Sequence, residues 1–276
     1  MSPIVTDTSP ASMAYGVEEN LIACFTELAA ARGSVREDDG ITTIITGIPV
    51  GAFNGVFRAH FPSDLPRDQL DARISATLGH LNDVALPYTW YVMPSSWPVD
   101  LGERLVARGL RLSEAAPGMA ADLHALHETG PMPDGLEIEP VREMATLRTW
   151  LRTGFAGFGI PSELEDPFFA LISEFALGPG GPAHYYLGRL DGQPVATSLS
   201  VFGGGVVGLY NIATVPEHRG KGIGAAMTLA PIHDARAQGY RIAILEASPM
   251  GFPVYQRLGF RQYITIRHYA PGQGAH

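Results

Sequence analysis

Apolar and polar positions in the second half of the chain alternate between two periods, which predicts a mixed α/β fold. Runs of apolar, β-type residues predict strands at residues 183–190, 195–202, 206–215, 242–247 and 262–269. Apolar residues three or four positions apart predict helices at residues 139–153, 166–175 and 225–238. Residues 154–165, between the first two helices, include Gly154, Gly157 and Gly159 and are expected to form a link.

The first half of the chain repeats part of this pattern more weakly. Its β-type runs, at residues 41–48, 55–60, 88–93 and 118–123, accompany an amphipathic helix at residues 67–81. A short helical run ends at Gly109, as another ends at Gly259, and on that alignment Leu105 takes the place of Tyr255. Residues 129–135 combine glycine and proline without an apolar period and are the best candidate linker. The sequence therefore predicts two related modules, residues 1–128 and 136–270, or a different α+β domain ahead of the second module.

Composition narrows the classes of function. Basic residues number 19 and acidic residues 28, and the net charge of −9 argues against nucleic acid or an anionic membrane as partner. Cys24 is the only cysteine, so neither disulfides nor a cysteine metal site are expected, and no His and carboxylate spacing suggests a metal. No apolar run approaches the ~18 residues of a membrane span, and residues 1–15 do not resemble a signal peptide. A cytoplasmic protein is expected, and the high Ala, Arg, Gly and Pro usage is typical of a GC-rich bacterial genome.

The most informative stretch is a glycine turn between a predicted strand and a predicted helix, Val215-Pro216-Glu217-His218-Arg219-Gly220-Lys221-Gly222-Ile223-Gly224. The first N–H groups of a helix lack intrahelical partners and lie at its positive end, so this arrangement favours a bound phosphate. Lys221 is followed by glycine rather than Ser or Thr, which excludes a Walker nucleotide loop. Met227 stands where the dinucleotide fingerprint needs its third glycine.

The pattern Arg219-x-x-Gly222-x-Gly224 resembles the R/Q-x-x-G-x-G/A signature of the GNAT superfamily of N-acetyltransferases. A second stretch is similar to another GNAT signature, a short helix with Tyr255 that ends in Leu258-Gly259-Phe260. The resemblance covers residues 137–270 and implies the order β-α-α-β-β-β-α-β-α-β there. It implies an α/β GNAT fold, in two tandem modules if the first half is a degenerate copy. The implied reaction is N-acetylation of a primary amine, of a small molecule in the first instance, with acetyl-CoA as co-substrate and no metal.

The resemblance also implies roles for individual residues. The main chain at Ala213, Thr214 and Val215 would pair with the pantetheine arm, and Ser248 would contact the coenzyme by its side chain. The pyrophosphate would be held by Arg219, Gly220, Lys221, Gly222, Ile223 and Gly224. Tyr255 would be the general acid, because a phenol of pKa near 10 stays protonated at neutral pH and can donate to a thiolate of pKa about 8.5. Alternatively, Tyr255 is only a packed aromatic residue.

The general base and the acceptor are less well defined. Strand 206–215 lacks the glutamate that some members carry, so Glu246, a carboxylate in an apolar strand, is the candidate base; it could instead bind the ammonium or cap a backbone group. Glu163, Glu165 and Asp166 either begin a solvated helix or steer a cationic amine. The turn at residues 61–66 has no glycine, so the first module is expected to lack a coenzyme site. A homodimer, a protein or peptide acceptor, and a non-catalytic acetyl-CoA sensor or scaffold stay open.

Overall fold

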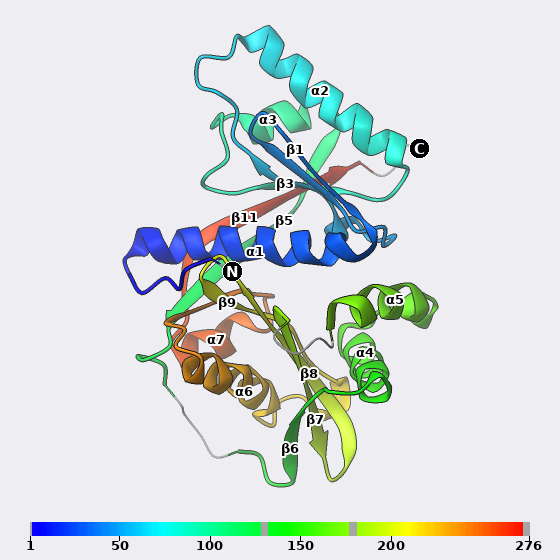
Figure 1. Ribbon diagram of the computed structural model, residues 1–276, viewed down its shortest axis with the longest axis vertical. Helices are drawn as coiled ribbons and strands as arrows, with labels where there is room; N and C mark the ends of the chain where they lie inside the picture. Colours follow the sequence, from blue (N-terminus) through cyan, green and yellow to red (C-terminus); the bar gives the residue numbers. More distant parts are fainter. Residues whose placement is uncertain (1, 128–131, 177–180, 273–276) are drawn as a thin grey trace. The chain divides into compact units, whose positions relative to one another are not determined.

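The computed structural model describes residues 2–127, 132–176 and 181–272, so part of the predicted linker at 129–135 lies outside the described residues. The chain divides into two compact units (Figure 1). Unit 1 comprises Met1–Cys24 and Gly118–Tyr263, and unit 2 comprises Phe25–Pro117 and Ile264–His276. Three elements contribute residues to both units: α1 (Pro10–Arg32), β5 (Leu110–Asp122) and β11 (Arg261–Pro271).

Unit 1 is a mixed sheet with α6 and α7 on one face and α4 and α5 on the other (Figure 1). From the end of β5 its strand order is β10 (Ile242–Glu246), β9 (Val206–Thr214), β8 (Gln193–Gly203), β7 (Ala183–Leu190) and β6 (Leu136–Pro140). Strand β10 runs parallel to β9 and antiparallel to β5. The helices are α4 (Met144–Phe158), α5 (Glu165–Ala176), α6 (Ile223–Ala237) and α7 (Phe252–Leu258), with short 3₁₀ turns η2 (Ser162–Leu164) and η3 (Pro216–His218).

Strand periodicity explains how the two faces are divided, because successive side chains point to opposite sides of a sheet. Tyr185 of β7 packs edge-on against Trp150 of α4, with 4.8 Å between ring centroids. The next residue, Tyr186, faces α6 and its hydroxyl donates a 2.5 Å hydrogen bond to Asp234.

Helix α4 differs from the prediction at both ends. It begins after β6 rather than at Glu139, and it continues to Phe158, so the predicted link at 154–165 is wrong over its first turn. The glycines there allow close packing instead of breaking the helix: a Cβ on Gly157 would lie 2.8 Å from the Cβ of Ala213 on β9. The helix ends at Gly159, which adopts the left-handed conformation (φ 70°) that suits a C-terminal glycine.

Unit 2 repeats the central motif of unit 1. Its strands run in the order β1 (Ser34–Asp38), β2 (Ile41–Ile45), β3 (Asn54–Ala59), β4 (Thr89–Val92) and β11, with α2 (Arg67–Val84), α3 (Leu101–Val106) and the 3₁₀ turn η1 (Gly51–Phe53). Strands β3 and β4 are parallel, like β9 and β10. Leu105 is fully buried, and Gly109 follows α3 in the left-handed conformation (φ 90°), as Gly259 (φ 103°) follows α7. The alignment of Leu105 with Tyr255 thus has a structural counterpart.

The last strand of the first sequence half, β5, pairs within unit 1, and the last strand of the second half, β11, pairs within unit 2. In unit 1, residues 118–122 of β5 pair with all of β10, from Gly118 opposite Glu246 to Asp122 opposite Ile242. An ion pair between Asp122 and Arg241, at 2.6 Å, fixes the end of this strand. In unit 2, residues 267–269 of β11 pair with β4. The hydrophobic pattern predicts strands at 118–123 and 262–269 but does not show which sheet edge each one pairs with.

Helix α1 was not predicted, because the buried polar residues Glu18 and Asn20 interrupt its apolar stripe. The Asn20 amide donates to the carbonyl oxygens of Val201 and Gly203, at 3.0 and 2.9 Å, and its Oδ1 accepts from the Tyr210 hydroxyl at 2.8 Å. The start of the chain is therefore part of unit 1. Although α1 has 23 residues, neither it nor another helix in the described part of the chain has the length and apolar composition of a membrane span.

Candidate active site

Strands β9 and β10 are paired at one end and separate at the other. Their parallel register comprises only Val207 opposite Ala243 and Gly208 opposite Ile244. Beyond Gly208, β9 has a bulge: its register with β8 shifts between Thr197 and Leu199, and Asn211 has a φ of 50°. A bulge bends its strand and increases the local twist. The sheet consequently opens between two neighbouring parallel strands.

A cavity of about 710 Å³ lies at this opening, and all its lining residues belong to unit 1. It is lined by most of the residues expected to hold the coenzyme or donate a proton: Ala213, Thr214, Arg219, Gly220, Gly222, Ile223, Gly224, Ser248 and Tyr255. Val215, Lys221 and Glu246 are not among its lining residues. Ten further residues line it: Gly157, Phe158, Ile212, His218, Ala225, Pro249, Met250, Gly251, Val254 and Arg257. No Asp or Glu of the described chain lines the cavity, whereas Arg219 and Arg257 do, which suits an anionic ligand.

The glycine loop presents unpaired backbone donors. Gly222 is the N-terminal cap of α6, and both Gly220 (φ 75°) and Gly222 (φ 82°) adopt the left-handed conformation that glycine favours. Arg219 N donates to Pro216 O and Ala225 N to Gly222 O, but within the described residues the N–H groups of 220–224 donate to no protein acceptor. Consecutive free N–H groups at a helix start form an anion-binding site.

The Arg219 side chain is engaged within the protein. Its Nη2 donates to the carbonyl oxygen of Gly157 at 2.6 Å, and its Nε donates to that of Thr214 at 3.1 Å. The guanidinium therefore adds positive charge to the loop while it binds α4 and β9.

Tyr255 lies in α7, almost completely buried at 8% exposure, and still lines the cavity. Burial raises its pKa from 10 to about 12, so the hydroxyl stays protonated throughout the neutral range. The turn before α7 packs closely against the Tyr255 ring, because a Cβ on Gly251 would lie 2.7 Å from a ring carbon. The same turn is held by a hydrogen bond from Gly251 N to Ser248 Oγ at 3.1 Å. A positioned, protonated phenol can act as a general acid.

Glu246 is half-buried at the end of β10, outside the cavity lining. Burial raises the pKa of Tyr210 on β9, and the negative charge of Glu246 raises it further. Glu246 is the last residue of β10, two residues beyond Ile244, the last residue that pairs with β9, so it lies at the opening of the sheet.

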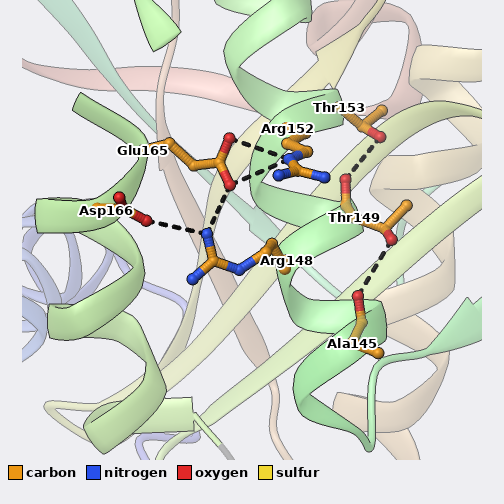
Figure 2. Close-up of polar contacts among 7 residues, drawn as sticks. All are labelled: Ala145, Arg148, Thr149, Arg152, Thr153, Glu165 and Asp166. Atoms are coloured by element: carbon orange, nitrogen blue, oxygen red, sulfur yellow. Dashed lines mark hydrogen bonds and ion pairs between the residues drawn. The ribbon is translucent and has the colours of Figure 1, made fainter. Parts of the chain in front are cut away.

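The acidic residues after α4 are neutralised by arginines of that helix. Figure 2 shows Glu165 accepting from Arg148 and Arg152, at 2.7 and 2.9 Å, while Asp166 accepts from Arg148 at 3.0 Å. Hydrogen bonds from Arg152 and then Arg148 lower the pKa of Glu165. Neither acid lines the cavity, so this arrangement favours the structural interpretation over attraction of an amine.

Comparisons with known proteins identify the domain that holds this cavity. Residues 144–260 match the family model described as Acetyltransferase (GNAT) family, and a search of curated proteins found no match. A GCN5-related N-acetyltransferase from Kribbella flavida aligns over 98% of both chains at 17% identity, with a TM-score of 0.73. Another from Sphaerobacter thermophilus covers 95% of this chain and 92% of its own, at 13% identity and a TM-score of 0.62.

A tandem GNAT protein from the clavulanic acid biosynthesis pathway covers 86% of this chain and 79% of its own, at 15% identity and a TM-score of 0.59. At these identities the likeness shows the fold, and it confirms the predicted pair of GNAT-like modules. Residues 144–260 thus form a GNAT acetyltransferase domain, that of an acyltransferase, within a chain that shares its fold with solved GNAT proteins.

Proposed function

We propose that the protein transfers the acetyl group of acetyl-CoA to a primary amine of a small molecule. One observation carries the proposal: a single cavity joins the free N–H groups of residues 220–224 to the buried hydroxyl of Tyr255. The N–H groups suit the pyrophosphate of the coenzyme. The opened edge of β9 at Ala213 and Thr214 would pair with the pantetheine arm and supply the N–H that stabilises the oxyanion, whereas the N–H of Val215, the third residue expected there, donates to Val195 O.

The reaction then follows from the positions of these groups. The neutral amine attacks the thioester carbonyl carbon, the carbon–sulfur bond breaks, and the departing thiolate takes the proton of Tyr255. The new amide nitrogen loses its extra proton to a base, for which Glu246 is our candidate, through water because Glu246 does not line the cavity.

We also propose that the first module does not bind the coenzyme. The turn that corresponds to the glycine loop leads from β3 to α2 and ends at Pro66, the N-terminal cap of α2. A proline has no N–H to offer, and the turn contains no glycine. With Leu105 in the place of Tyr255, this module would also lack the acid.

The variant Tyr255→Phe tests the proposed role of the acid. General acid catalysis contributes about 10²–10⁴-fold, so kcat should fall by that factor while the Kd of acetyl-CoA changes little. Coenzyme A release, followed with a thiol reagent, would be measured against panels of small primary amines and of peptides. An unchanged kcat would refute the role of Tyr255. Acetyl-CoA binding without turnover for any amine would support a sensor or scaffold, and turnover with peptides alone would support a protein acceptor.

A further inference from the structure

Arg219 begins the glycine-loop signature, and its side chain joins three segments of unit 1. Nη2 donates to Gly157 in the last turn of α4, and Nε donates to Thr214, the last residue of β9. Both contacts use charged N–H groups, which form stronger hydrogen bonds than neutral donors. One guanidinium therefore ties the coenzyme loop to a helix end and a strand end.

The C-terminal end of α4 has backbone carbonyl groups that the Arg219 side chain can pair with. The last four carbonyl groups of a helix have no intrahelical donor, and a cation there meets the negative end of the helix dipole. The Phe155 carbonyl accepts from Gly159 N and Ile160 N, whereas the Gly157 carbonyl accepts from Arg219. Because Gly157 has no side chain, this turn can lie directly against Ala213. Arg219 thus caps α4 and holds it against β9.

Phe158 connects the hydrogen bonds of Arg219 with function. It follows Gly157 directly, its side chain is 54% exposed, and it lines the cavity. We propose that Arg219 is a positioning residue that couples the glycine loop to the last turn of α4, so that coenzyme binding orders Phe158 over the cavity. The coupling rests on the proposed function for its ligand, whereas the capping contact does not.

If Arg219 is only a phosphate ligand, a different set of side chains can replace it. A phosphate ligand needs positive charge, which lysine also supplies. Arg219 reaches the two carbonyl oxygens from two different nitrogens, Nε and Nη2, whereas lysine carries all its donors on one nitrogen at the end of its side chain. Arg219→Lys therefore separates the two roles.

Hydrogen–deuterium exchange of residues 155–160, in the full-length protein with and without acetyl-CoA, tests the proposal. Without the coenzyme, Arg219→Lys and Arg219→Ala should exchange these amides roughly tenfold faster than wild type, because a charge-assisted hydrogen bond is lost. Lys221→Ala, in the same loop, removes a charge that does not cap α4 and should leave this exchange unchanged. Calorimetry should show that Arg219→Lys binds acetyl-CoA with nearly wild-type affinity. Acetyl-CoA should slow the exchange in wild type but not in Arg219→Lys.

Two results would overturn the inference. If residues 155–160 of Arg219→Lys exchange at the wild-type rate with and without acetyl-CoA, the hydrogen bonds of Arg219 do not stabilise the end of α4. Loss of acetyl-CoA affinity in Arg219→Ala alone, with unchanged exchange in both variants, would identify a phosphate ligand instead. If the wild-type protein does not bind acetyl-CoA, the coupling fails with the proposed function, and the capping contact is still decided by the exchange without coenzyme.

Discussion

Removal of residues 1–135 should abolish the fold of the acetyltransferase unit, although the family signatures lie entirely in residues 136–270. A fragment 136–270 lacks strand 118–122, which pairs with all five residues of β10. It also loses Met119 and Leu123, both fully buried in the core cluster that contains Tyr255. Loss of each of these side chains costs about 2–5 kcal/mol. The two together amount to roughly 4–10 kcal/mol, against the ~5–15 kcal/mol of a typical domain.

The assay compares three proteins by circular dichroism, urea unfolding and calorimetry with acetyl-CoA: the full chain, fragment 136–270, and the full chain with Met119→Ala. We expect the fragment to show no cooperative unfolding and no binding. Met119→Ala should lose about 2–5 kcal/mol of unfolding free energy. Leu112→Ala is the matched control, because Leu112 is 49% exposed on the same strand and should change stability little. A cooperatively folded fragment that binds acetyl-CoA like the full chain would refute the claim that residues 118–122 are needed to complete the sheet of unit 1.

Three further predictions follow from single residues. Gly222→Asp should weaken acetyl-CoA binding at least tenfold, because it strains a residue at φ 82° and adds negative charge to the phosphate site; calorimetry that shows unchanged affinity would contradict the assignment. Asn20→Ala should lose about 1–3 kcal/mol in urea unfolding, because carbonyl groups of β8 lose a buried donor, and an unchanged unfolding midpoint would count against its role. The pKa of Tyr255 is raised to about 12 from 10, so its stability contribution is fully present below pH 10 and is lost as the pH rises toward 12. Wild type should accordingly lose about 1 kcal/mol more than Tyr255→Phe between pH 9 and pH 11, and equal losses would argue that this hydroxyl is not buried.

Local sequence signals predicted many of the residues that line the cavity. The turn from Arg219 to Gly224 and the helix with Tyr255 were recognisable because glycines in a strand–turn–helix and a tyrosine before Leu-Gly-Phe are determined by adjacent residues. The helical conformation of the lining residues Gly157 and Phe158 was not predicted, because the three glycines between 154 and 159 suggest a break in a helix. Packing against Ala213 overrides that preference, and only the tertiary structure reveals it.

The pairing partners of β5 and β11 and the helix α1 could not be predicted for a different reason. Residues 118–123 have a strand pattern wherever they pair, and nothing local distinguishes β10 from an edge within the first module. The position of Asn20 in unit 1 depends on carbonyl groups about 180 residues further along the chain, with separations of 181 and 183. Such long-range partners leave no periodic trace in the sequence.

Calorimetric titration of the full-length protein with acetyl-CoA tests the central claim most directly. We expect one site per chain, with binding severely weakened in Gly222→Asp and retained in Tyr255→Phe. No binding would contradict an acetyl-CoA-dependent function for the cavity between β9 and β10, and two sites per chain would show that the first module also holds the coenzyme.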